Sequence, residues 1–144
     1  MKIVVGTDGS ESAHAAIDFA CEEAKVRQAE LSVVHAWNYV YTGVDGFGGA
    51  GVDMVSMIEP EAQRVLDAEA AYAAERCGNE VSVRKVLVHG SASAALLDEG
   101  KDAFMIVVGS RGRGGFSSLL LGSTSNQVVH HATTPVVVIR QPEG

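Results

Sequence analysis

A segment rich in glycine and hydroxyl residues spans residues 109–125 and follows an apolar run that ends at Val108. Gly109 and Gly112 have no Cβ, so the backbone at these positions can turn sharply and bring its N–H groups within hydrogen-bonding distance of a phosphate. Glycines at this spacing directly after a predicted strand therefore favour a loop that binds an anion.

A second group of the same kind lies at the start of the next predicted helix. Nine residues separate Gly112 from Gly122. Three hydroxyl side chains follow Gly122 directly: Ser123, Thr124 and Ser125. The first N–H groups of a helix have no acceptor within the helix, and the helix dipole places partial positive charge at that end. The two groups together predict a cradle for a polyphosphate.

Three charged residues could take part in this chemistry, and each has a second interpretation. Asp8 precedes Gly9-Ser10 and could contact the ligand, or it could form a turn and cap the following helix. Arg111 and Arg113 could offset phosphate charge, or they could point into solvent from the loop.

The apolar pattern predicts strands that alternate with helices. The strands are expected at residues 3–5, 31–36, 81–88, 104–108 and 136–139. Helices are expected after the cap residues Ser10 and Ser91, from Pro60 as a first helical residue, and from about Ser123. Strands joined by helices form a parallel sheet with helices on both faces. We therefore expect an α/β fold with a single doubly wound domain over residues 1–144.

The order of the strands follows from which runs are continuously apolar. Residues 3–5 and 104–108 are typical of central strands, whereas residues 81–88 carry Arg84 and Lys85, as an exposed edge would. A five-stranded sheet of order 3-2-1-4-5 is the simplest arrangement. Its connections reverse between the first and fourth strands, and open α/β sheets bind ligands at the carboxyl ends of the strands at that point.

Composition narrows the function classes. A net charge of -7 disfavours nucleic acid as a partner, because such binding relies on many Lys and Arg side chains. No apolar run approaches the roughly 20 residues of a membrane span. The sequence runs from Met1 directly into a predicted strand, without the pattern of a secretory signal, so we expect a cytoplasmic protein.

The two cysteines, Cys21 and Cys77, both lie in predicted helices. Neither belongs to a C-x-x-C pair or has the Cys/His spacing of a zinc site. We expect buried free thiols.

The pattern Gly109-x2-Gly112-x9-Gly122-Ser123 resembles the signature of the ATP-binding branch of the universal stress protein family. The resemblance extends from residues 3–10 to residues 134–140. It implies a fold like that of the adenine nucleotide α-hydrolases, with ATP and Mg²⁺ as the bound ligands.

The resemblance also implies roles for individual residues. Asp8 would reach the ribose or a metal ion bound to the phosphates, and Ala36 would line the adenine pocket. Thr7 and Val108 would flank the base or the sugar. The phosphates would lie against residues 109–112, which include Arg111, and against residues 122–125.

The leading hypothesis is a signalling module of the stress response, in which ATP occupancy changes the contacts made with an unknown protein partner. Turnover is not expected beyond weak ATPase activity. The apolar strand Val136 to Ile139 is predicted at an open sheet edge, and edges of this kind pair with another chain. Together with the resemblance, this favours a homodimer.

Three alternatives remain open on the sequence. A slow ATPase or phosphotransferase needs a base to activate its nucleophile, and Asp8 is the one candidate. An adenylating or pyrophosphatase enzyme usually carries Ser-Gly-Gly-x-Asp-Ser in the first loop, from which the present Gly6-Thr7-Asp8-Gly9-Ser10 departs. A dimeric scaffold without nucleotide typically lacks the glycine pattern that is complete here.

Overall fold

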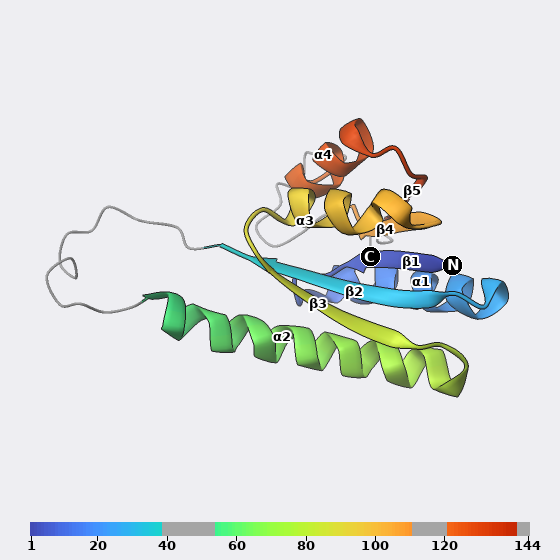
Figure 1. Ribbon diagram of the computed structural model, residues 1–144, viewed down its shortest axis with the longest axis horizontal. Helices are drawn as coiled ribbons and strands as arrows, with labels where there is room; N and C mark the ends of the chain where they lie inside the picture. The colour runs from blue at the N-terminus through green and yellow to red at the C-terminus, as the bar shows by residue number, and fades with distance from the viewer. Residues whose placement is uncertain (39–53, 111–120, 141–144) are drawn as a thin grey trace, which may run out of the picture.

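The computed structural model describes residues 1–38, 54–110 and 121–140. A parallel sheet of five strands, in the order β3-β2-β1-β4-β5, forms its centre (Figure 1). The strands are β1 Lys2–Gly6, β2 Glu30–Trp37, β3 Val83–His89, β4 Met105–Gly109 and β5 Val136–Ile139. The expected fold class and strand order are both confirmed.

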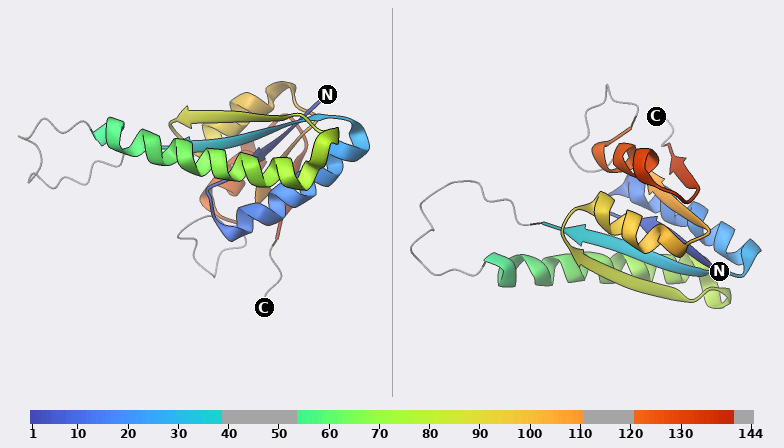
Figure 2. Two further views of the ribbon diagram at one scale, coloured as in Figure 1. Left: turned by 90° about the horizontal axis from the view of Figure 1, so that it is seen from below. Right: turned by 45° about the horizontal axis from the view of Figure 1, so that its top comes forward.

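Helices cover both faces of the sheet, as Figure 2 shows from two further directions. The helices are α1 Glu11–Arg27, α2 Met54–Cys77, α3 Ala92–Glu99 and α4 Ser123–His131, with short 3-10 turns η2 Gly78–Glu80 and η3 Gly100–Asp102. None of the described helices combines the length and hydropathy needed to cross a bilayer.

The core lies in two layers because successive strand residues point to opposite faces of the sheet. Ile3 and Val5 of β1 face α1 and α2, where they belong to a buried cluster with Ile17. Val4 points the other way, toward α3 and α4, and shares a second cluster with Leu96. The continuously apolar run of β1 is thus buried on both sides.

The helices pack through the stripes that the sequence predicts. In α1 the stripe residues Ala13, Ile17, Ala20 and Ala24 are all buried. The small alanines let the helix approach the sheet closely. Helix α3 begins as expected at Ser91, whose hydroxyl accepts a hydrogen bond of 3.1 Å from the N–H of Ala94. That bond satisfies one of the unpaired donors of the first turn.

The predicted start of the second helix at Pro60 is wrong. Helix α2 begins at Met54 and contains Pro60 in its interior. A proline inside a helix removes one backbone hydrogen bond, that to the carbonyl four residues earlier. Pro60 is exposed, and the helix continues through the proline.

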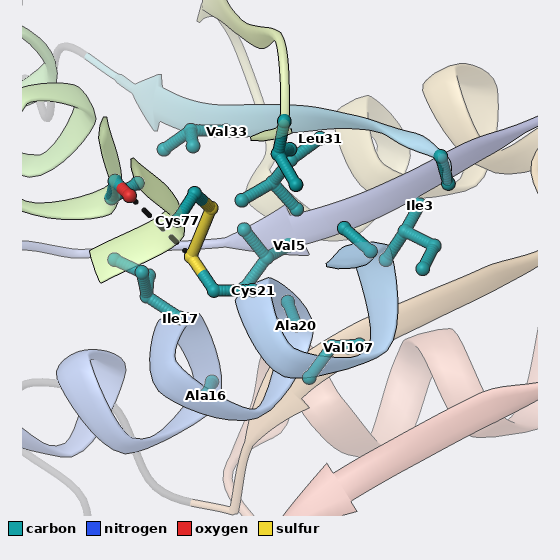
Figure 3. Packing of buried hydrophobic residues seen from close by; sticks show 14 of the residues in the cluster. Ile3, Val5, Ala16, Ile17, Ala20, Cys21, Leu31, Val33, Cys77 and Val107 are labelled. Atoms are coloured by element: carbon teal, nitrogen blue, oxygen red, sulfur yellow. Dashed lines mark hydrogen bonds between the residues drawn. A yellow bond between two sulfur atoms is a disulfide. The ribbon is translucent and has the colours of Figure 1, made fainter. Parts of the chain in front are cut away.

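The expectation of free thiols is also wrong. Cys21 of α1 and Cys77 of α2 form a disulfide between helices that lie side by side under the sheet (Figure 3). Their Cα atoms are 5.1 Å apart, within the range that a disulfide requires. Both side chains are buried, as expected. Local spacing rules do not detect this pairing because 56 residues separate the two cysteines.

Candidate functional site

The candidate site lies where β1 and β4, the two central strands, reach their carboxyl ends. Val5 pairs with Val107, so the chain segments after both strands leave the same edge of the sheet. Helix α1 then crosses one face and α4 the other, as the two buried clusters show. The reversal of connection expected between these strands is therefore present.

Asp8 forms a turn at the start of α1. Its Oδ1 atom accepts a hydrogen bond of 2.9 Å from the N–H of Ser10 and another from the Ser10 hydroxyl. Gly9 has a φ of 82°, which glycine adopts without strain. The turn interpretation of Asp8 is confirmed, and contact with a ligand stays a prediction. Ser10 occupies the N-cap position of α1, but its side chain makes no cap hydrogen bond.

Thr7 is held from several directions. Its N–H donates to the carbonyl of Val34 over 2.9 Å, and its own carbonyl lies 2.9 Å from Nδ1 of His35. Its hydroxyl donates to Oε2 of Glu69 over 3.0 Å and accepts from the N–H of Gly9 over 3.1 Å. The side chain of Thr7 is therefore turned toward α2 and anchors the turn.

A set of hydrogen bonds joins the end of β4 to the start of α4. The N–H of Gly122 donates to the carbonyl of Ser110 over 2.6 Å. The hydroxyl of Ser125 lies 3.3 Å from the same carbonyl and 3.1 Å from that of Gly122. The residue after β4 and the start of α4 are thus joined, whereas Arg111, Gly112 and Arg113 lie outside the described residues.

The side chains at the start of α4 differ in orientation. Ser125 is buried, with a relative exposure of 2%, and its hydroxyl donates back into the protein. Ser123 is exposed and Thr124 is half-buried. The first main-chain bond of the helix runs from Asn126 N–H to the Gly122 carbonyl. The N–H groups of residues 123–125 precede this bond and have no helical acceptor.

Two of the residues predicted near the base lie on β2 and β4, the strands on either side of β1. Val108 at the end of β4 is buried, and Ala36 near the end of β2 is half-buried. Both pack in the cluster between the sheet and helices α3 and α4. The structure therefore places Ala36 and Val108 on the same face of the sheet.

Sequence reasoning missed Glu69 and His14. Glu69 of α2 is 6% exposed, and its Oε1 atom lies 3.0 Å from Nε2 of His14 on α1. A signal was available, because Glu69 lies four residues from Ala73 and eight from Cys77, on the buried stripe of the helix. An acidic residue on such a stripe indicates a specific polar contact.

No group of three or more His, Cys, Asp or Glu side chains that could hold a metal ion occurs among the residues described.

Residues 1–140 match the model of the universal stress protein family. A protein of Mycobacterium tuberculosis strain H37Rv, universal stress protein Rv2005c, is 39% identical over 139 residues, which cover 96% of this chain and 45% of that protein. The chain spans about half the length of the curated relatives it matches.

Solved structures show the same fold. A universal stress protein in complex with cAMP matches with a TM-score of 0.71 and 24% identity, over 97% of this chain and 96% of that one. A universal stress protein from Archaeoglobus fulgidus in complex with dAMP matches with a TM-score of 0.70 and 24% identity, over 96% and 97% of the two chains.

Proposed function

Because this chain belongs to the universal stress protein family, we propose that it binds an adenine nucleotide where β1, β4 and the start of α4 meet. The observation that carries the proposal is the bond from Gly122 N–H to the Ser110 carbonyl, which sets the first turn of α4 beside the end of β4. Two proteins of the same fold are complexes with cAMP and dAMP, which share an adenine, a sugar and a phosphate.

ATP with Mg²⁺ is the nucleotide we propose, on the strength of the glycine pattern. Mg²⁺ in nucleotide sites is commonly held by phosphates, water and one or two carboxylates. Asp8 can supply one carboxylate, and the described residues hold no acidic cluster that would bind the ion without a nucleotide. The side chains thus fit an ion that arrives on the nucleotide and neutralises its charge there.

The chain's own groups have separate tasks in this proposal. The N–H groups and hydroxyls of Ser123 and Thr124 donate to the phosphates, together with the backbone of Gly109. Arg111 and Gly112 contribute from the segment outside the described residues. Ala36 and Val108 lie against the adenine, and Asp8 reaches the ribose or the metal ion.

Retention of the nucleotide is favoured over its turnover. Hydrolysis or phosphoryl transfer needs a base that orients the nucleophile. Oδ1 of Asp8 accepts hydrogen bonds from Ser10, and Oε2 of Glu69 accepts one from Thr7. These two oxygens hold the turn, so we do not assign either of them as the base. We infer a nucleotide-dependent module of the stress response that is read by a protein partner.

The proposed module is a homodimer that pairs through β5 and works in the cytoplasm. One observation opposes this location, because disulfides are rare in reducing compartments. Trapping the thiols of Cys21 and Cys77 directly in lysed cells decides the question. Free thiols in the trapped protein support the cytoplasm, and a fully oxidised pair overturns that part of the proposal.

The test is a calorimetric titration of nucleotide-free protein with ATP and Mg²⁺, with cAMP and dAMP as competing ligands. Gly122→Val should abolish binding, because its side chain would stand at the junction of the two glycine segments. Ser91→Ala is the matched control, since it removes a helix cap from α3, costs about 1 kcal/mol and leaves the site intact.

The nucleotide recovered after titration separates the functions. Intact ATP supports the binding module, and ADP supports a slow ATPase. Wild-type protein that binds none of the three nucleotides would leave a scaffold without nucleotide and end the proposal.

A further inference from the structure

We propose that Glu69 is a positioning residue of the nucleotide site, which holds Thr7 and, through Thr7, the turn that carries Asp8. The inference rests on the proposed function and adds a residue of α2 to a site otherwise built from the ends of β1 and β4 and the start of α4.

The contacts of Glu69 carry the inference. Oε2 accepts the Thr7 hydroxyl over 3.0 Å, and Oε1 lies 3.0 Å from Nε2 of His14. Both carboxylate oxygens therefore have partners, as a buried charge requires. These contacts join α2 to α1 and to the residue that follows β1.

The hydroxyl of Thr7 connects Glu69 to the turn that follows β1. It donates to Glu69 and accepts the N–H of Gly9, so one rotamer of Thr7 satisfies both contacts. The next bond along the chain runs from Ser10 N–H to Asp8 Oδ1. Loss of the acceptor on α2 frees the Thr7 side chain to rotate, and the turn that orients Asp8 then loses its fixed partner.

Burial makes a purely space-filling role a poor explanation. Glu69 is 6% exposed, and the neighbouring stripe positions on α2 hold Leu66 and Ala73, which pack with no charge to desolvate. Burying a carboxylate is costly unless its hydrogen bonds are made. Unlike an apolar residue, Glu69 supplies a hydrogen-bond acceptor for the hydroxyl of Thr7.

A second polar pair on the same two helices provides a control. The hydroxyl of Tyr72 donates to Asp18 over 2.9 Å. The Tyr72 ring also stacks on the ring of His14, with centroids 4.0 Å apart, and Tyr72→Phe keeps this stacking while it removes the bond to Asp18. Burial raises the pKa of the Tyr72 hydroxyl, and the hydrogen bond to Asp18 raises it further. The bond between the Tyr72 hydroxyl and Asp18 therefore tests the packing of α1 on α2 while the contacts of Glu69 with His14 and Thr7 stay intact.

The experiment measures ATP affinity with Mg²⁺ by calorimetry, and thermal unfolding of the nucleotide-free protein, for Glu69→Met, Thr7→Val, Thr7→Ser and Tyr72→Phe. Met has about the length of Glu and no carboxylate acceptor, so we expect Glu69→Met and Thr7→Val each to weaken binding about tenfold, and the double variant to lose little more than either alone, because both break one contact. Thr7→Ser keeps the hydroxyl and should bind within about twofold of wild type. Tyr72→Phe should lower the unfolding temperature and leave affinity unchanged.

Each result decides the question. If wild type binds ATP and both Glu69→Met and Thr7→Val bind it equally well, the positioning role is overturned while the proposed function stands. A tenfold loss in Tyr72→Phe would also overturn it, since general loosening of the helices would then explain the effect. If Glu69→Met does not fold, the comparison of Thr7→Val with Thr7→Ser decides the question. Failure of wild type to bind removes the proposed function itself.

Discussion

Hydroxyl side chains around the candidate site have two different orientations. Those of Thr7 and Ser125 are turned into the protein, where they bond Glu69 and the carbonyls of Ser110 and Gly122. Ser123 is exposed at the start of α4. A hydroxyl that already donates inside the protein cannot give the same proton to a phosphate. Ser125 therefore supports the loop structure, whereas the hydroxyl of Ser123 is available to a ligand.

This division predicts different effects for two alanine substitutions. Ser125→Ala removes the hydroxyl that joins Ser110 to Gly122 and should lower the free energy of unfolding by about 1 kcal/mol. Ser123→Ala should change it by less than about 0.5 kcal/mol, because the side chain is exposed. Urea unfolding of the nucleotide-free proteins measures both values.

Calorimetry on the same two variants completes the comparison. Ser123→Ala should weaken ATP binding without a change in stability, whereas Ser125→Ala should weaken it together with stability. Equal stability of the two variants would contradict the assigned orientations.

At the scale of elements, helix stripes and caps are predictable because they depend on local spacing. The stripe of α1 and the cap of α3 follow from the sequence alone. The contacts between α1 and α2 do not, because they depend on which helices share a face of the sheet. The Cys21–Cys77 disulfide and the His14–Glu69 contact both belong to this second kind. The Pro60 error has a different origin. Local rules place a proline at the first position of a helix, whereas the exposed Pro60 is tolerated in the interior of α2.

The disulfide between α1 and α2 should contribute strongly to stability. A cross-link between residues 56 positions apart lowers the chain entropy of the unfolded state. The loss predicts an increase of about 4 kcal/mol in the free energy of unfolding. Oxidised wild type should therefore unfold at a higher urea concentration than both the reduced protein and the Cys21→Ala/Cys77→Ala variant. A thiol count of two per chain in the unfolded, unreduced protein would contradict the bond.

At the scale of the whole molecule, the strand order was predictable because a strand buried on both faces has a continuous run of apolar residues. Continuous apolar runs identify β1 and β4 as central, and the reversal between them locates the candidate site. The site itself is only partly predictable. Glycine spacing identifies the segments that meet, but the residues that hold them, such as Glu69, come from distant parts of the chain.

Strand β5 lies at one edge of the sheet. Its backbone N–H and C=O groups face β4 on one side and point away from β4 on the other. In a parallel strand, alternate residues direct both backbone groups toward the same neighbour. The carbonyl of Pro135 accepts from Ile106 N–H, and that of Ile139 accepts from Ser110 N–H. Residues 135, 137 and 139 therefore face β4. Val138 directs its N–H and C=O away from β4, toward the side where a second chain would pair.

This geometry gives a direct test of the proposed dimer. Val138→Pro removes one outward donor and keeps the pairing with β4, because proline is tolerated on the free side of an edge strand. Wild type should be a dimer by light scattering and Val138→Pro a monomer with unchanged circular dichroism. Val137→Pro, the matched control, should lower stability because its N–H faces β4. A dimeric Val138→Pro variant would move the interface to another surface, and a monomeric wild type would remove the dimer altogether.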